Sequence, residues 1–599
     1  MRRLILALIL FLQSTAFAMP PIMPLNEVQN GMTGTAYTVV DSTGVIKNFS
    51  VKIVGTLDNG KGSKPYIMAE ASGDVVTNTG GVLQGMSGSP VYINGKLVGA
   101  LSAGFQNLSP YTFLITPIED MLNIWNLPDN FNLNPYEEIE TVEEKTEDVE
   151  KTDEGEENSG EVENKDAEEI LPENVSEIED AEDAATIIYS GFDSAGLNYL
   201  KNSLSDFGLK NYTLASGGGV PSLNFDAELF PGSAFGVCVV CGDFVVGATG
   251  TATVVEDKKI LGFGHSFTHG GNVNYFMTDA NVIGAVSGIL GGGMKVASAG
   301  SIIGRINQDR ESGVGGIIGQ FPSTVPISVT VNDDNYNALM AYNEILVPKL
   351  GAAIAYSALN KYADNTAEGT VKVSFDIKTN IVDSGILSRE NIYYAPADVG
   401  QLAVTELLTA LNLVSTNSTA ESDIFGIDVK MNFNPLRNTA SLVKAEADKA
   451  LVKPGEEIKL KVTLQPYRRK EIVVEVPYKV PITAKEGAFI LDIHGGGLVP
   501  VAQVQQAGVI LPSTKTPQQS YNDKIQQLLN ANKNNELIIK PSAVVRTEKE
   551  LKAEVKRMKK LAEDLQKRGI KPTATTPTKF ATDYVIDNVI QCKINVDKL

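Results

Sequence analysis

The chain has 599 residues, of which 43% are apolar and 21% are charged. At roughly 100 to 200 residues per domain this length allows three to five domains, and the composition excludes a wholly disordered or fibrous chain. The formal charge is −21, but residues 137–183 alone hold 23 acidic residues and 3 lysines, so the remainder is nearly neutral and without basic clusters. This excludes nucleic acid as a partner, because its recognition depends on phosphate neutralisation.

Residues 1–18 have the pattern of an export signal. Arg2 and Arg3 precede the apolar run 4–12, and residues 16–18 (Ala-Phe-Ala) have the small-x-small spacing that suits cleavage before Met19. No later run reaches the roughly 18 to 20 apolar residues of a membrane span. We therefore expect an exported protein, periplasmic or extracellular, with no integral membrane span once the signal is removed.

The first domain is predicted at residues 27–127. Short alternating runs, broken by glycines at intervals of about ten residues, are typical of an all-β sandwich or barrel. A short helix at 117–125 is predicted to close this domain. The acidic stretch 137–183 has hardly an aromatic residue and no periodic apolar face, so it is predicted to be a disordered linker.

Two further domains are predicted after the linker. Residues 187–382 begin with a helix at 194–207, continue with strands at 234–255, 302–318 and 324–331, and include a helical interval at 336–362. Cys238 and Cys241 lie in one of these strands and are interpreted as buried, inert thiols. Residues 383–512 show a period of two at positions 458 to 464, which predicts an immunoglobulin-like β-sandwich.

The last part, 513–599, is predicted to be a C-terminal α/β tail with one strong helical signal. Thr547 and Glu550 form a capping box, apolar residues recur at helical spacing from 551 to 565, and Gly569 and Pro572 mark the end. The pattern predicts an amphipathic helix of about 21 residues. Its expected role is packing against the chain or docking to a partner protein.

The run Gly85-Met86-Ser87-Gly88-Ser89-Pro90 carries the strongest chemical signal. An isolated serine is a poor nucleophile, so it needs a base and donors that stabilise the developing oxyanion. Glycines beside Ser87 let a substrate carbonyl approach the backbone N–H groups of Gly85 and Ser87, the predicted oxyanion hole. On spacing alone, an ordinary Gly/Ser turn before a hairpin explains the run as well.

This run, with Thr79-Gly80-Gly81 just upstream, resembles the nucleophile segment of the SpoIVB-type peptidase family (S55). GxSGxP is also shared with chymotrypsin-like serine peptidases. The stretches 31–34, 116–122 and 263–267 resemble the same family, so the likeness spans roughly residues 27–335. It implies a cleft between two β-rich half-barrels, a protein or peptide as substrate, and no cofactor or metal.

Histidine is scarce: His265, His269 and His494 are the three in the chain, and all follow Ser87. In its Gly-His context the resemblance implies that His265 is the general base and then the general acid. In the family the histidine segment precedes the serine segment, whereas here the order is reversed. Such a permuted order is tolerable because triads are defined by geometry.

The acid of the triad is left open. The resemblance implies an acid a little upstream of the nucleophile, where Ser72 stands in this chain. Asp74, two residues later, is the candidate, with Asp243 and Asp279 as competitors closer to His265. A serine–histidine dyad and an inactive relative are further alternatives.

The two histidines of this segment and the run 304–310 allow other interpretations. His265 and His269 would lie on one face of a helix and bind metal, but the glycines around them disfavour a helix. A structural histidine held in a turn is the simpler alternative. Residues 304–310 resemble another segment of the family, and only a turn is expected there.

The sequence thus predicts a mainly β protein. It would contain the two half-barrels of a chymotrypsin-like peptidase in permuted order, an immunoglobulin-like β-sandwich and a C-terminal helical segment. The predicted function is that of an exported serine endopeptidase using Ser87, His265 and Asp74, with Gly85 and Ser87 as oxyanion donors. The alternative is an inactive, peptidase-like binding or assembly scaffold in the envelope or outside the cell.

Overall fold

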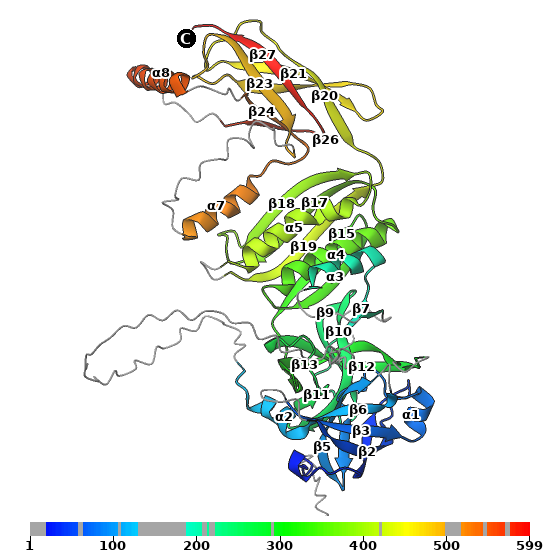
Figure 1. The fold of residues 1–599 in the computed structure, drawn as a ribbon. Helices are drawn as coiled ribbons and strands as arrows, with labels where there is room; N and C mark the ends of the chain where they lie inside the picture. Colours follow the sequence, from blue (N-terminus) through cyan, green and yellow to red (C-terminus); the bar gives the residue numbers. More distant parts are fainter. Residues whose placement is uncertain are drawn as a thin grey trace, which may run out of the picture.

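The computed structural model of the chain describes residues 19–57, 64–105, 109–129, 187–205, 212–214, 222–288, 293–417, 422–497, 517–542, 548–568 and 576–598. The predicted signal (1–18), the predicted linker (137–183) and Thr547 of the predicted capping box lie outside these residues. The described part is mainly β, as the sequence predicts. Figure 1 shows its parts in a row, with the N-terminal barrel at one end and the C-terminal strands at the other.

The first barrel closes through six antiparallel strands in the order β1-β2-β3-β6-β5-β4. These are β1 (Thr33–Thr38), β2 (Lys47–Leu57), β3 (Tyr66–Ser72), β4 (Pro90–Ile93), β5 (Lys96–Phe105) and β6 (Ser109–Pro117). The helix α1 (Asp74–Thr79) follows β3; α2 (Ile118–Leu122) and the 3-10 turn η2 (Asn123–Asn126) follow β6, where the sequence predicts a helix. A second 3-10 turn, η1 (Leu25–Glu27), precedes β1. Alternating side chains of the strands, such as Phe49, Val51 and Ile53, fill the interior.

A second ring of six strands forms the second barrel. Its strands are β9 (Ala234–Gly242), β10 (Val245–Glu256), β11 (Lys259–Gly262), β12 (Gly271–Val286), β13 (Met294–Arg310) and β14 (Gly313–Ile318). They pair in the order β9-β12-β13-β14-β11-β10, and the β9–β10 pairing closes the ring. β7 (Ile187–Ser190) and β8 (Tyr212–Leu214) extend the sheet from β10. Each predicted half of the peptidase is therefore a barrel of its own.

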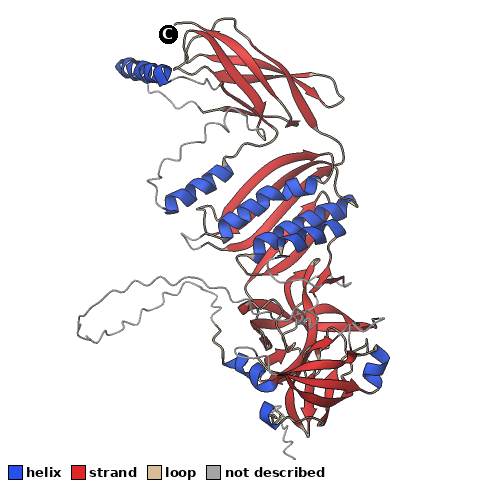
Figure 2. Cartoon of the chain, in the orientation of Figure 1, coloured by secondary structure: helices blue, strands red, loops and turns tan. Residues whose placement is uncertain are grey.

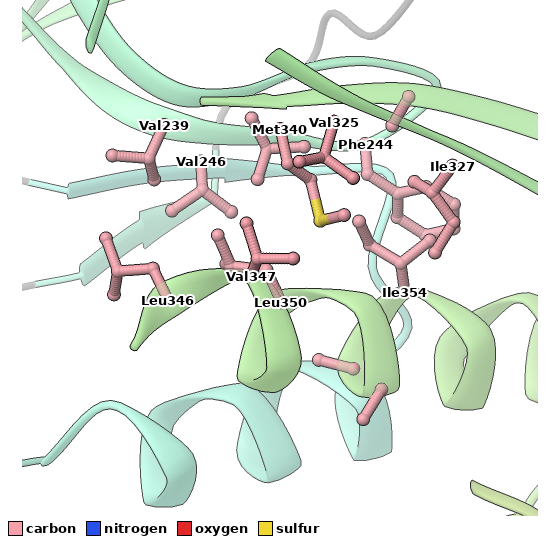
Figure 3. Close-up of a cluster of buried hydrophobic side chains, with 14 of the residues drawn as sticks. Val239, Phe244, Val246, Val325, Ile327, Met340, Leu346, Val347, Leu350 and Ile354 are labelled. Atoms are coloured by element: carbon pink, nitrogen blue, oxygen red, sulfur yellow. The ribbon is translucent and has the colours of Figure 1, made fainter. Parts of the chain in front are cut away.

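A layer of helices on a sheet follows the second barrel. The sheet continues through β16 (Asp334–Ala341), β15 (Thr324–Val331), β19 (Ile424–Asn434), β17 (Gly369–Thr379) and β18 (Ile386–Ala395). The helices α3 (Ser194–Ser203), α4 (Leu346–Ala363) and α5 (Val399–Ser415) cover one face of it (Figure 2). Apolar side chains from β9, β10, β15, β16 and α4 form one continuous cluster (Figure 3), which joins this layer to the second barrel.

The C-terminal part is a sandwich of two four-stranded sheets. One sheet has the order β22-β21-β20-β26 and the other β25-β24-β23-β27. The strands are β20 (Thr439–Ala447), β21 (Glu457–Pro466), β22 (Ile472–Lys479), β23 (Gly487–Gly495), β24 (Glu536–Pro541), β25 (Thr578–Ala581), β26 (Val585–Ile586) and β27 (Val589–Val596). The helix α8 (Glu548–Lys567) accompanies it and confirms the predicted amphipathic helix, whereas α7 (Pro517–Leu529) packs against β18 and α5 of the preceding layer. No helix in the described ranges is long and apolar enough to cross a bilayer.

Several expected boundaries differ from the observed ones. Residues 336–341 belong to β16 and not to a helix, because they complete a hairpin with β15 before α4 begins. The expected division after residue 382 falls between β17 and β18, which pair with each other. The sandwich expected at 383–512 lies at 439–596, because β24, β25 and β27 of the predicted tail supply most of its second sheet and β26 joins the first.

The cluster that joins the second barrel to the helical layer gives a prediction. Leu350 in α4 is fully buried, whereas Leu402 in α5 is 46% exposed. Leu350→Ala is expected to lower the free energy of unfolding by about 2 to 5 kcal/mol, because it removes buried contacts and leaves a cavity. Leu402→Ala should cost under about 1 kcal/mol. Urea unfolding followed by circular dichroism measures both, and equal losses would contradict the assigned core.

Candidate active site

Residues 84–90, called the serine loop below, form the last part of the connection from α1 to β4 and include Pro90, the first residue of β4. Gly85 and Gly88 have positive φ angles of 88° and 95°, a region that favours glycine. At Gly88 a Cβ atom would lie 1.9 Å from the carbonyl oxygen of Thr251 in β10. The glycine therefore allows the second barrel to contact the loop directly beside Ser87.

The second barrel holds most of the carbonyl groups of the serine loop. Four of the five carbonyls from 84 to 88 accept from β10 or β13: Lys295 N to Gln84 O at 2.8 Å, Thr251 Oγ1 to Gly85 O at 3.3 Å, Thr251 N to Ser87 O at 2.8 Å and Thr253 Oγ1 to Gly88 O at 2.7 Å. The remaining carbonyl, Met86 O, accepts from the N–H of Ser89 at 2.9 Å and from its hydroxyl at 2.6 Å. All five carbonyls from 84 to 88 are thereby fixed.

The N–H groups of the loop divide into two sets. The first set donates to backbone carbonyls: Gln84 to Gly293, Met86 to Leu83, Gly88 to Leu101 and Ser89 to Met86. The N–H groups of Gly85 and Ser87, in contrast, donate to no residue that the structure describes. A trans peptide is planar with its N–H opposite its C=O, so the held carbonyls of Gln84 and Met86 fix the directions of these two N–H groups. They are the two donors predicted for the oxyanion hole.

The Ser87 side chain is half-buried beside β5. Its hydroxyl donates to the carbonyl oxygen of Ser102 at 3.3 Å. A hydroxyl has one proton, so in this arrangement the proton is not directed at an imidazole. The hydroxyl must turn its proton away from Ser102 O before Ser87 can transfer that proton to a base.

His265 lies in residues 263–270, called the histidine loop, between β11 and β12. The ring is 5% exposed, and Nδ1 is 2.7 Å from the carbonyl oxygen of Ser266. Because a carbonyl only accepts, this contact assigns the proton to Nδ1 and leaves the lone pair of a neutral ring on Nε2. This is the tautomer that a general base requires.

The two loops meet on strand β5. A Cβ atom on Gly264 would lie 3.2 Å from the Cβ of Ser102, the residue whose carbonyl accepts from Ser87. The carbonyl oxygen of Gly264 also accepts from the Thr116 hydroxyl in β6 at 2.6 Å. The segments around Ser87 and His265, which are far apart in the sequence, are therefore held against the same strand of the first barrel.

The three candidate acids lie elsewhere. Asp74 is exposed in the first turn of α1. Asp243 accepts from the backbone N–H of Asn337 at 2.7 Å, and Asp279 accepts from that of Ser301 at 2.8 Å. The Ser266 carbonyl, and not one of these carboxylates, is the acceptor that the structure places on Nδ1 of His265.

Asp309 organises the histidine loop, and the sequence analysis missed it. It is fully buried in β13, within the run 304–310 that was expected to be a turn. Its carboxylate accepts from Phe267 N and Thr268 N at 2.7 Å, from the Thr268 hydroxyl at 2.8 Å and from Gly270 N at 3.2 Å. The family-like run around Asp309 was the available signal, but its partners belong to a distant segment of the sequence.

Lys295 is a second group that the sequence did not single out. It is 3% exposed, and its amino group donates to the Thr251 hydroxyl at 3.3 Å. Burial lowers its pKa from 10.5 to about 7. Its side chain lies beside Gly85, where a Cβ atom would meet Lys295 Cβ and Cε at 3.2 Å each.

The structure also bears on the metal and thiol interpretations. His269 is exposed with a φ of 56° in a loop, so it does not share a helix face with His265. Within the described ranges, no group of three or more His, Cys, Asp or Glu side chains could hold a metal ion. Cys238 and Cys241 are buried free thiols, and their mutual hydrogen bond together with burial raises the pKa of Cys241.

Residues 12–122 match the family model described as SpoIVB peptidase S55. The match confirms the resemblance predicted from the serine motif. It covers the first barrel with Ser87 and ends in α2, so it does not extend to His265. No curated protein and no solved structure matches the chain.

The Asp309 contacts give a testable prediction. Asp309→Asn replaces one acceptor oxygen by an amide that faces N–H donors, so we expect a loss of about 2 to 4 kcal/mol in stability. Faster amide hydrogen exchange at residues 266–270 should accompany it, measured by mass spectrometry. The matched control, Asp334→Asn at the exposed start of β16, should change neither quantity. Unchanged exchange in the histidine loop would contradict the role of Asp309.

Lys295 gives a prediction on pH. The unfolded chain keeps this proton up to a pKa of about 10.4, whereas the folded protein loses it near 7. Between these values the unfolded state binds more protons, so stability rises with pH across this window. In urea unfolding from pH 6.5 to 10.5, the wild type should gain a few kcal/mol more than Lys295→Met does. Parallel pH profiles would contradict the prediction.

Proposed function

We propose that the chain is an exported serine endopeptidase of the SpoIVB (S55) type. The observation that carries the proposal is the serine loop. All five of its carbonyls from 84 to 88 are held, while the N–H groups of Gly85 and Ser87 next to the hydroxyl meet no described acceptor. Preorganised donors of this kind, aimed at a position where negative charge develops, are a main source of catalysis in acyl transfer.

The proposed chemistry uses groups of both barrels. Ser87 Oγ attacks the carbonyl carbon of a peptide bond while its proton passes to Nε2 of His265, and the oxyanion accepts from the N–H groups of Gly85 and Ser87. His265 then gives that proton to the leaving amine as the C–N bond breaks, which leaves an ester on Ser87. Water hydrolyses the ester by the same route, with His265 first as base and then as acid.

The orienting group in this proposal is the Ser266 carbonyl. It accepts the Nδ1 proton at 2.7 Å and so keeps the lone pair of His265 on Nε2. This favours the serine–histidine dyad that the sequence left open. Asp74, the acid predicted from the sequence, is exposed in α1, and in the dyad it has no catalytic role.

Export is part of the proposal and is supported by the signal-like pattern of residues 1–18. Cleavage before Met19 would turn the Met19 nitrogen into a charged α-amino group. That nitrogen lies 3.2 Å from a carboxylate oxygen of Glu256 in β10. The new N-terminus would therefore form an ion pair with the second barrel.

The second candidate is a scaffold without peptidase activity. It is favoured by one observation, the direction of the Ser87 hydroxyl toward Ser102 O. If this hydrogen bond is permanent, the serine is not a nucleophile. The chain would then bind or assemble other proteins through a peptidase-like fold.

A fluorophosphonate probe tests the proposal, because it reacts with activated serines. We expect labelling of the purified wild type at Ser87, located by peptide mass spectrometry. Ser87→Ala should abolish the labelling, and His265→Ala should slow it by at least about a hundredfold, since it removes the base. The matched control, Ser328→Ala on the exposed side of β15, should label like the wild type.

Each result decides between the two candidates. Folded wild-type protein that stays unlabelled would contradict the peptidase and favour the scaffold. Labelling that persists in Ser87→Ala would remove Ser87 from the mechanism. Asp74→Asn separates the dyad from the triad: unchanged labelling is expected for the dyad, and a loss comparable to that of His265→Ala would restore Asp74 as the acid.

A further inference from the structure

Lys295 is a buried amine beside the serine loop that the proposed chemistry does not use. It stands in β13, on the second barrel, and its amino group reaches Thr251 in β10. None of the ion pairs between described residues includes it, and burial is the one cause of its lowered pKa. A lysine kept in such a place costs stability, because burying an amine without a counter-charge is unfavourable.

We propose that Lys295 is a positioning residue of the oxyanion hole. It holds in place the two peptide planes on either side of Gly85. The inference rests on the proposed peptidase function and deepens it. In this inference a residue of the second barrel sets the direction of the Gly85 N–H group, which belongs to the first barrel.

The main chain of Lys295 fixes the first of the two peptide planes. Its N–H donates to Gln84 O at 2.8 Å, and the N–H of Gln84 donates in turn to Gly293 O at 3.0 Å. Gln84 and Met294 thus form a parallel β-bridge between the loop and β13. Since Gln84 O and Gly85 N belong to the same planar peptide, this bridge points the Gly85 N–H away from β13.

The side chain of Lys295 fixes the second plane through Thr251. The amino group donates to Thr251 Oγ1 at 3.3 Å, and the same hydroxyl donates its one proton to Gly85 O at 3.3 Å. The lysine occupies the lone-pair side of the hydroxyl and so directs the proton at the loop. Without the amine, the hydroxyl is free to rotate and the Gly85–Met86 peptide loses a support.

The packing of the lysine stem supports the same role. A Cβ atom on Gly85 would lie 3.2 Å from both Cβ and Cε of Lys295, so the stem lies along the backbone of Gly85. Methionine has a stem of similar length without the amine. Lys295→Met therefore removes the hydrogen bond to Thr251 and keeps most of the packing.

The test measures the reaction of Ser87 with a fluorophosphonate probe at several probe concentrations. Saturation kinetics then separate the first-order rate of phosphonylation from the apparent affinity for the probe. For Lys295→Met we expect the rate to fall about 10- to 100-fold with unchanged affinity, because the oxyanion donors act on the transition state. The melting temperature should stay equal or rise, since an uncompensated buried amine is removed.

Two further variants complete the design. Thr251→Val keeps the shape of the side chain and breaks the same relay, so its rate should fall to a similar extent. In the double variant the two losses should not add, because both act through Gly85 O. Ile303→Val, at a fully buried position of the same strand, is the matched control, and its rate should equal that of the wild type.

The outcomes separate this inference from the proposed function. Lys295→Met or Thr251→Val with the wild-type rate would overturn the inference and leave the peptidase intact. Complete loss in folded Lys295→Met, equal to that of Ser87→Ala, would overturn it too, since a base and not a positioning residue would be missing. If the rate falls only together with the melting temperature, Lys295 has a structural role alone, and the inference is overturned. A wild type without labelling at Ser87 would overturn both proposals.

Discussion

The contact between the serine loop and the second barrel is the constraint on which the candidate site depends. The first barrel carries Ser87, the proposed nucleophile, but on its own it leaves most of the loop's carbonyls without donors. Thr251, Thr253 and the backbone of Lys295 provide these donors from the other barrel. Because peptide planes are rigid, each held carbonyl also fixes an N–H direction. In the proposed oxyanion hole, the second barrel therefore fixes the direction of the Gly85 N–H through Gln84 O, whereas Ser89 of the loop itself fixes that of the Ser87 N–H through Met86 O.

The contacts that hold the histidine loop are likewise independent of the order of the two barrels along the chain. The histidine loop is fixed from both sides, by Asp309 within its own barrel and by Thr116 of the first barrel. Neither contact requires a particular connection between the barrels. What the fold must preserve is the packing of Gly264 against β5, where even a methyl group on Gly264 would press against Ser102 and Ala100.

Local signals made much of the fold predictable, and long-range contacts limited the rest. The motif around Ser87 and the Gly-His pair at 264–265 depend on turns, which leave glycines in the sequence. The alternation in β21 and the apolar spacing in α8 are likewise local. Asp309 and Lys295, in contrast, act on partners that are distant in the sequence, so the family-like run 304–310 marks the segment of Asp309 without indicating what it contacts, and Lys295 has no local mark. Residues 336–341 were misassigned because the strand depends on its hairpin partner β15.

The match of residues 12–122 to a peptidase family shows the same difference between local sequence signals and long-range contacts. The matched range includes the glycines and the serine of the loop. It does not reach the residues of the second barrel that hold the loop in its conformation. A chain can thus carry a recognisable serine motif and still owe its chemistry to the other barrel. Lys295 is consequently informative about the proposed activity, because its N–H holds the Gln84 carbonyl and thereby the direction of the Gly85 N–H group.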